Sequence, residues 1–286
     1  MGAPCEYDDY MSGIEDGVAR VVSVRGMALA ALTPLIGLAA CGGGDQPPWK
    51  AAPPAKGPSA AEAGYVAPPA VLTLRVEPQG VVLSGSAQPG AKVMLGTPTG
   101  ETLDAQAGAD GRWTATAPVS DVVRLYGLFM VVDGRKVQSE GYLVLTPDGR
   151  SAELRAGGGA RVMAAGSRPP RILAIDYDGD GGTVVSGVGT ANADVGLRID
   201  RASGGASVVG AGGRFAIPLG RPLASGAHAF EVAAEGGEDT VLAPTTRAAP
   251  LDDSVYRAAR FDGGWRIDWA TPGGGVQTTL LLDRRG

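Results

Sequence analysis

One stretch of the sequence occurs twice, and this repeat constrains the fold more than any other feature. Val82–Val93, VLSGSAQPGAKV, aligns without gaps with Val184–Val195, VVSGVGTANADV, at an offset of 102 residues. The same offset places Gly111–Trp113 on Gly213–Phe215. Separate segments that keep one register predict two copies of one domain, which agrees with the roughly two domains that a chain of 286 residues accommodates.

Within each copy the pattern is that of short antiparallel strands joined by turns. Val71–Val76, VLTLRV, is rich in residues that favour strands, and the breaker EPQG follows it. Asp110–Gly111 and Gly212–Gly213 are hairpin-type turns. The 46 glycines fall between apolar runs, and no amphipathic helix of useful length competes. We therefore expect an all-β chain with two tandem β-sandwiches of about seven strands each.

The first copy resembles the bacterial immunoglobulin-like modules, whose first hairpin reads Ser-Gly-x-Ala-x-Pro-Gly-Ala-x-Val and whose later strand follows Asp-Gly-x-Trp. The second copy departs from this pattern at Asn192, Asp194 and Phe215. The resemblance covers roughly residues 70–245 and implies an immunoglobulin-like fold used for adhesion, spacing and binding, and rarely for catalysis. The matching residues of the first copy are Ser84, Gly85, Ala87, Pro89, Gly90, Ala91, Val93, Asp110, Gly111 and Trp113.

The C-terminal residues 255–282 have the pattern of a three-stranded meander. In its middle strand Trp265, Ile267 and Trp269 share one face. A three-stranded sheet is marginal alone, so we expect the meander to pack on the second domain; it is either a truncated third copy or a completion of that domain. Trp265 and Trp269 either cover a core or an interface, or form a platform on which a sugar stacks.

The N-terminal part of the sequence indicates export. Gly26–Ala40 is an uncharged apolar run of 15 residues, preceded by Arg20 and Arg25. It is shorter than the ~20 residues that cross a bilayer and has the layout of a secretory signal. Leu38–Cys41, LAAC, resembles the lipobox of bacterial lipoproteins. The resemblance implies that Cys41 is acylated, and Gly42 after it implies sorting to the outer membrane. The alternative is a buried helix that ends in an ordinary cysteine.

These features divide the chain into five parts. A lipoprotein signal peptide covers 1–40, with translation starting at Met1, at Met11 or at a valine such as Val24. A disordered linker rich in Pro, Ala and Gly covers 41–69. Immunoglobulin-like domains cover 70–150 and 170–245, and the meander covers 250–286.

One acidic motif has the spacing of a cation site. Asp176, Asp178 and Asp180, followed by Gly181, match the first half of a calcium-binding loop, because alternating carboxylates converge on a hard cation. The twelfth position of that loop is Gly187, where the bidentate glutamate would stand. The motif is therefore read as a solvated acidic hairpin turn, with calcium as the alternative cofactor.

The sequence contains few of the residues that catalysis or nucleic-acid binding would need. The only histidine, His228, falls in a strand, which indicates a structural role, and His-containing triads and His/Cys metal sites lack their residues. The formal charge is −5, and no cluster of Lys and Arg appears. We expect no enzymatic activity and no nucleic-acid partner.

The sequence thus predicts a lipid-anchored, non-catalytic envelope protein at the outer membrane, facing the periplasm. It would bind an envelope protein or a polysaccharide, or act as a spacer. The first alternative is an accessory lipoprotein that recognises carbohydrate or peptidoglycan. The second is an assembly factor of an outer-membrane or secretion complex.

Overall fold

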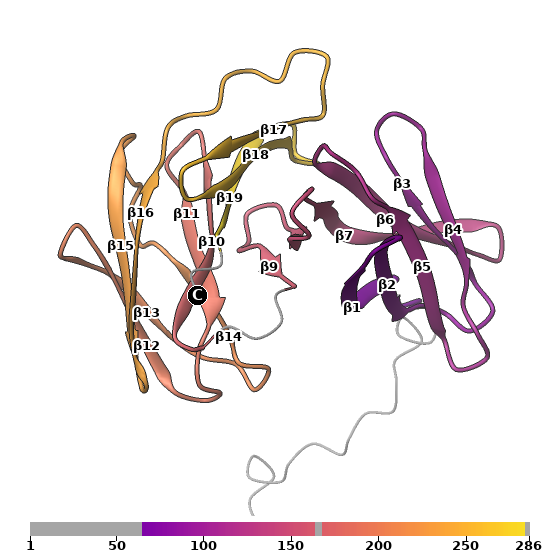
Figure 1. Cartoon of the computed structure of the whole chain (residues 1–286), viewed down its shortest axis with the longest axis horizontal. Coiled ribbons are helices and arrows are strands. Elements are labelled where there is room, and N and C mark those ends of the chain that lie inside the picture. The colour runs from indigo at the N-terminus through magenta and orange to yellow at the C-terminus, as the bar shows by residue number, and fades with distance from the viewer. Residues whose placement is uncertain (1–64, 164–167, 284–286) are drawn as a thin grey trace, which may run out of the picture. The chain divides into compact units, whose positions relative to one another are not determined.

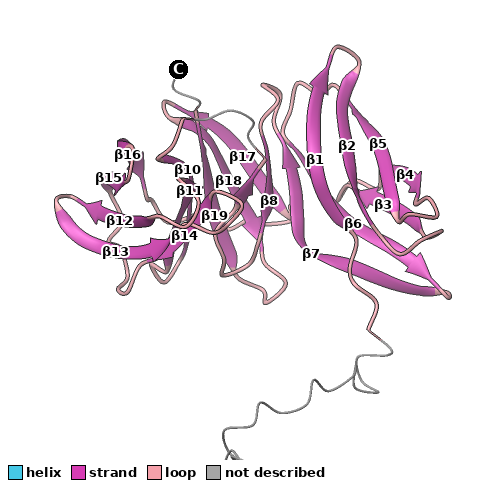
Figure 2. Cartoon of the chain, turned by 90° about the horizontal axis from the view of Figure 1, so that it is seen from below, coloured by secondary structure: helices cyan, strands magenta, loops and turns pink. Residues whose placement is uncertain are grey.

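Every regular element in the described part of the chain is a β-strand (Figures 1 and 2). The computed structural model describes residues 65–163 and 168–283, and its strands form four antiparallel sheets. The predicted all-β fold is confirmed. The expected signal peptide, Cys41 and residues 41–64 of the expected linker lie outside the described residues. Among the residues that are described, no helix is long and apolar enough to cross a membrane.

The first sandwich contains seven strands in two sheets. One sheet has the order β1-β2-β5, and the other begins β4-β3-β6-β7. Alternation builds the core between them: in β5, Trp113, Ala115 and Ala117 point inward while the residues between them are exposed. The strands are β1 (Ala70–Glu77), β2 (Gly80–Ser86), β3 (Lys92–Gly96), β4 (Thr102–Gln106), β5 (Arg112–Pro118), β6 (Arg124–Val132) and β7 (Arg135–Leu145).

The second sandwich repeats this arrangement strand for strand. Its sheets run β14-β11-β10 and β13-β12-β15-β16, with Phe230, Leu197 and Ile217 fully buried between them. The 3 + 4 order of both copies is an immunoglobulin-like Greek key, so the tandem sandwiches are present as predicted. The strands are β10 (Arg171–Asp178), β11 (Thr183–Val188), β12 (Asp194–Ile199), β13 (Ala202–Val208), β14 (Arg214–Pro218), β15 (Ala227–Ala234) and β16 (Gly237–Pro244).

The C-terminal meander comprises β17 (Tyr256–Phe261), β18 (Gly264–Ala270) and β19 (Val276–Leu282). It joins the second sandwich edge to edge, because β19 pairs antiparallel with β10, from Ala174 opposite Leu281 to Asp178 opposite Gln277. The resulting sheet has six strands in the order β14-β11-β10-β19-β18-β17. The meander therefore completes a sheet of the second sandwich.

A third core lies between the two six-stranded sheets. The segment after the first sandwich forms β8 (Ser151–Leu154) and β9 (Arg161–Val162), which extend the sheet beyond β7. Side chains of β6, β7 and β8 pack there against β10, β18 and β19. The buried members are Val123, Leu125, Val144, Ala152, Leu154, Ala160, Ala174, Ile267, Trp269 and Leu281. We call this cluster the shared core.

Candidate functional site

Trp269 belongs to the shared core and has no exposed surface. Its indole N–H donates to Oγ1 of Thr279 at 3.2 Å, and its ring meets that of Tyr142 edge to face, with centroids 5.8 Å apart. Trp269 is therefore a core residue, and the alternative in which it forms part of a platform for a sugar is wrong. The strand alternation places both tryptophans on one face, but β7 and β8 cover that face at Trp269.

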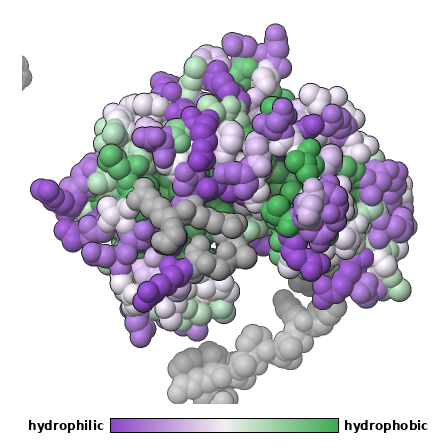
Figure 3. Space-filling model, viewed as in Figure 1, coloured by the Kyte–Doolittle hydropathy of each residue, from purple (hydrophilic) through white to green (hydrophobic). Residues whose placement is uncertain are grey.

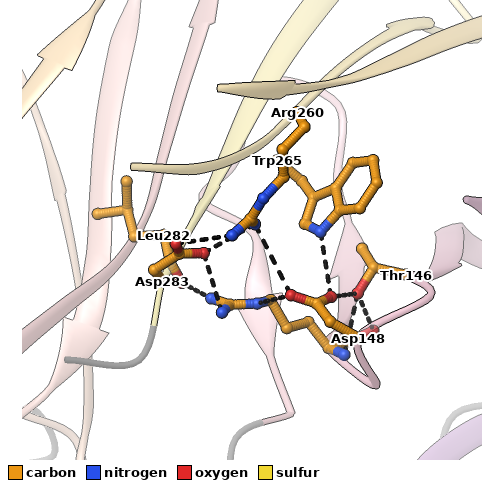
Figure 4. Close-up of polar contacts among 7 residues, drawn as sticks. Thr146, Asp148, Arg260, Trp265, Leu282 and Asp283 are labelled. Carbon is orange, nitrogen blue, oxygen red and sulfur yellow. Dashed lines mark hydrogen bonds and ion pairs between the residues drawn. The ribbon is translucent and has the colours of Figure 1, made fainter. Parts of the chain in front are cut away.

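Trp265 is half-buried, and its polar edge already has a partner in the β7–β8 turn (Figure 4). The indole N–H donates to Oδ1 of Asp148 at 3.0 Å. The guanidinium of Arg260 lies 5.6 Å from the ring centroid. A ligand that used Trp265 would contact only the part of the ring that these residues leave open.

Around Trp265 four charged residues form one network, which we call the ion-pair cluster: Asp148, Arg150, Arg260 and Asp283. Arg260 binds Asp283 with two hydrogen bonds of 2.9 and 2.8 Å. Arg150 bridges Asp148 and Asp283 at 2.8 and 2.9 Å. Burial alone would raise the pKa of Asp148, but hydrogen bonds from Thr146 and Arg150 hold that pKa below its ordinary value. The cluster connects the β7–β8 turn to the end of β19.

Asp176, the first residue of the acidic motif, is buried at 2% exposure within β10. Its carboxylate accepts hydrogen bonds from Thr279 Oγ1 at 2.6 Å, from the backbone N–H of Ala160 at 2.7 Å and from Gln277 Nε2 at 3.4 Å. Burial raises the pKa of this carboxyl to about 6, against the opposing effect of these donors. Asp176 therefore connects β10, β19 and the segment before β9.

Asp178 and Asp180 lie at the β10–β11 turn. Oδ1 of Asp178 accepts hydrogen bonds from the backbone N–H groups of Asp180 and Gly182, both at 2.9 Å, and so closes the turn. Across the described residues no group of three or more metal-ligating side chains occurs. Calcium binding remains a prediction, and a calcium titration of the melting temperature tests it.

A sizeable hollow lies in the second sandwich, beside the only histidine of the chain. This cavity of about 570 Å³, which we call the His228 cavity, is bordered by the β12–β13 hairpin, by the segment 219–224 and by His228 of β15. Glycines at 204 and 205 of β13 line it together with Leu219 and Leu223. Its volume falls in the range of small-molecule sites, ~300–1,000 Å³.

His228 is oriented by acceptors on both ring nitrogens. Nδ1 lies 2.6 Å from Oδ2 of Asp200, and Nε2 lies 2.9 Å from the carbonyl oxygen of Ala224. Partial burial lowers the pKa of the imidazole, but Asp200 and the Ala224 carbonyl outweigh it and raise the pKa above its usual value. Ser203 lines the same cavity. Because Nε2 faces a carbonyl, the ring is poorly placed to accept a proton from that hydroxyl.

The sequence identified His228 as a strand residue with a structural role, and it did not reveal the cavity. The cavity depends on Asp200 in the β12–β13 turn and on the segment 219–224, neither of which carries a recognisable motif. A usable signal was Gly204–Gly205 within an otherwise strand-like segment, because paired glycines in a strand often mark a close approach or an opening.

Hydrophilic side chains cover most of the face in Figure 3, and hydrophobic side chains gather there in smaller patches. Large apolar residues that are exposed include Val76 at 61%, Val119 at 67% and Leu242 at 66%. Single exposed apolar residues are normal on soluble domains. They do not by themselves define a site.

No family model and no curated protein matches the chain. Among solved structures, a biofilm associated protein, described by its BSP domain, is similar at 20% sequence identity with a TM-score of 0.23. The match covers 65% of this chain and 30% of that one, so this chain spans under a third of its length. At this TM-score the similarity supports no inference, and the fold assignment depends on the strand order described above.

Proposed function

We propose that the protein is a non-catalytic binding and spacing protein of the bacterial cell envelope. In this proposal a lipid on Cys41 holds it at the outer membrane, facing the periplasm, and residues 42–64 lie between the anchor and the sandwiches. The observation that best supports the spacing role is the shared core. It joins two immunoglobulin-like units that would otherwise reorient freely about the segment between them.

The contact between the two sandwiches is built from buried apolar side chains, with polar contacts added to them. Domains joined by a small polar contact are expected to move relative to each other, whereas a large hydrophobic interface holds them together. Here the shared core is apolar, the hydroxyl of Tyr256 donates to the carbonyl oxygen of Val123 at 2.8 Å, and the ion-pair cluster adds charged contacts. Two sandwiches held together in this way keep their far ends at a fixed separation, which is what a spacer requires.

The chemistry of the described residues supports a role without catalysis. Both nitrogens of His228 face acceptors, and the buried carboxyl of Asp176 is occupied by donors on three sides. His228 borders a cavity that also contains Ser203, but with an acceptor at each ring nitrogen it does not offer that hydroxyl a free base, and the carboxylate oxygens of Asp176 are already held by donors.

The lipid anchor is tested by metabolic labelling with palmitate and by membrane fractionation. Cys41→Ala is expected to abolish labelling and to release the protein from the outer-membrane fraction, because acyl chains supply the binding energy for the bilayer. Cys5→Ala is the matched control, since it removes the only other cysteine, and it should label normally. Labelling that persists in Cys41→Ala would contradict the anchor.

A second candidate function is the recognition of carbohydrate or peptidoglycan, which the volume of the His228 cavity favours. Gly220 lines this cavity, and a Cβ added there meets no atom within 4 Å, so the backbone tolerates a side chain and Gly220→Phe is designed to place a ring at the wall of the cavity. Gly212→Phe is the control, because Gly212 is equally open and does not line the cavity. Retention on purified peptidoglycan that Gly220→Phe alone abolishes supports this function, and no retention of the native protein removes it.

A role as an assembly factor is separated from both by crosslinking in cells. A single envelope complex recovered with the native chain favours that role. The absence of any crosslinked protein favours the spacer.

A further inference from the structure

A smaller hollow of about 180 Å³ lies between the β11–β14 pair and the segment 155–162. Three arginines line it, Arg155, Arg161 and Arg214, and we call it the arginine cavity. It also contains Ser186 of β11 and Gly159. None of these residues takes part in the ion-pair cluster or the His228 cavity.

The positive charge of this cavity is incompletely balanced. Among the described residues, the ion pair that these arginines form is that of Arg161 with Glu153, at 3.6 Å. Arg155 and Arg214 donate to the carbonyl oxygens of Gly159 and Val162, at 3.0 and 2.6 Å. The buried Asp176 is near enough for the charge of Arg155 to lower its pKa.

Two effects disfavour the charged form of Arg214 in this cavity. Burial lowers the pKa of its guanidinium, and the neighbouring charge of Arg161 lowers it further. Like charges held together in a partly buried place repel each other unless an anion lies between them. Guanidinium groups are also the side chains best suited to bind carboxylate and phosphate oxygens.

Ser186 supplies an independent sign of a ligand. The residue is 4% exposed, and its hydroxyl oxygen has no hydrogen-bond partner within the described chain. A buried hydroxyl without a partner is unfavourable and rare. The missing side chain at Gly159 lets the segment 155–162 lie against this hydroxyl without supplying it a partner: a Cβ on Gly159 would overlap the Ser186 hydroxyl and press on Val184. The cavity thus combines excess positive charge with an unused donor.

We propose that the arginine cavity binds a small oxyanion, a phosphate or carboxylate group, either free or as the end of a larger molecule. Arg155, Arg161 and Arg214 supply the charge, and the Ser186 hydroxyl donates a hydrogen bond. The volume of about 180 Å³ equals about six water molecules at ~30 Å³ each, which accommodates such a group with a few waters. This site does not depend on the proposed spacing function.

Isothermal titration calorimetry of the full chain tests the site. Inorganic phosphate and succinate are titrated as separate probes at constant ionic strength. We expect one saturable site per chain for at least one probe, and the tighter probe identifies the oxyanion class. Arg214→Gln should weaken binding at least tenfold. Arg112→Gln is the control, because Arg112 is an arginine with a side chain 76% exposed, and it should bind like the native protein.

Ser186→Ala separates binding from folding. This variant removes an unpartnered hydroxyl, so its melting temperature without ligand should be unchanged or higher, while its affinity for the same probe falls several-fold. If Arg214→Gln does not fold, Ser186→Ala decides the question. The proposal is overturned if neither probe saturates, or if the affinity of Ser186→Ala equals that of the native protein.

Discussion

Two glycines at equivalent positions of the repeat make room for a buried aromatic ring. A Cβ added at Gly85 would overlap the ring of Trp113 and the backbone oxygen of Ala70, and one at Gly187 would overlap the ring of Phe215. The glycine and the aromatic residue are opposite each other across the β2–β5 and β11–β14 pairs. The glycine and the aromatic residue therefore recur together at an offset of 102 residues, because each sandwich needs a position without a side chain where its buried ring packs.

Gly85→Ala is expected to lower the free energy of unfolding by about 1–3 kcal/mol, because overpacking forces the ring or the β1 strand to move. The midpoint of urea unfolding measures this change. Gly273→Ala is the matched control, since a Cβ at Gly273 meets nothing within 4 Å, and it should change stability by less than about 0.5 kcal/mol. Equal effects of the two substitutions would contradict the packing argument.

Asp176 gives the protein a pH dependence of known sign. Its pKa rises from 3.8 to about 6 on folding, so the folded protein holds a proton that the unfolded chain has released. The stabilising contribution is complete below the unfolded value and is lost as pH rises through about 6. At about 1.4 kcal/mol per pKa unit, the loss is about 3 kcal/mol.

Urea unfolding of the native protein and of Asp176→Asn between pH 4 and 8 measures this loss. The asparagine does not titrate, so the stability of the native protein relative to the variant should fall as pH rises to about 6 and then level off. A constant difference across that range would show that the carboxyl titrates normally.

Individual residues show where sequence patterns stop being informative. The core position of Trp113 follows from its own strand, which alternates regularly. The burial of Trp269 depends on Tyr142 and its neighbours in β7, more than 100 residues away. The acidic motif resembles an exposed turn, yet its first member is enclosed because Thr279 of β19 and the backbone of Ala160 lie against its carboxylate.

At the scale of elements, the sequence predicts where strands and turns lie better than it predicts which strands pair. The meander was expected over 255–282, and its three strands lie within those limits. Its pairing with β10 was not predicted, because each strand of an antiparallel sheet has the same pattern whether its edge is free or paired. The pieces β8 and β9 were missed because four and two residues carry too little periodicity.

Arg150 connects two elements that are far apart in sequence. Its side chain is 14% exposed, and it contacts Asp148, Asp283 and the carbonyl oxygen of Leu282. Arg150→Ala should cost about 2 kcal/mol, because it leaves the partly buried carboxylates of Asp148 and Asp283 without their shared charged donor. Hydrogen exchange should then be faster at the amides of β18 and β19.

The control is Lys92→Ala, which breaks the exposed pair of Lys92 with Asp104. Exposed ion pairs contribute about 0–1 kcal/mol, so exchange in β18 and β19 should stay at its native rate. If Arg150→Ala leaves exchange there unchanged, the ion-pair cluster does not hold the end of β19.

At the scale of the whole described unit, there are three hydrophobic cores, one more than the two that tandem domains require. Each sandwich has its own core, with Trp113 in the first and Phe230 in the second, and the shared core lies outside both. The sandwiches should therefore remain folded without the shared core but lose their coupling. The proposed spacing role depends on that coupling.

Trp269→Ala tests the coupling, because this side chain is the largest in the shared core and is fully buried. Differential scanning calorimetry of the native protein should give one cooperative transition. In Trp269→Ala the cavity left by the ring should lower the free energy of unfolding by about 3–5 kcal/mol. Because this loss affects the shared core, two transitions should appear, one for each sandwich. Trp265→Ala, which alters a half-buried residue at the rim, should keep one transition. Two transitions already in the native protein would mean that the sandwiches unfold independently, and a rigid spacer would then be excluded.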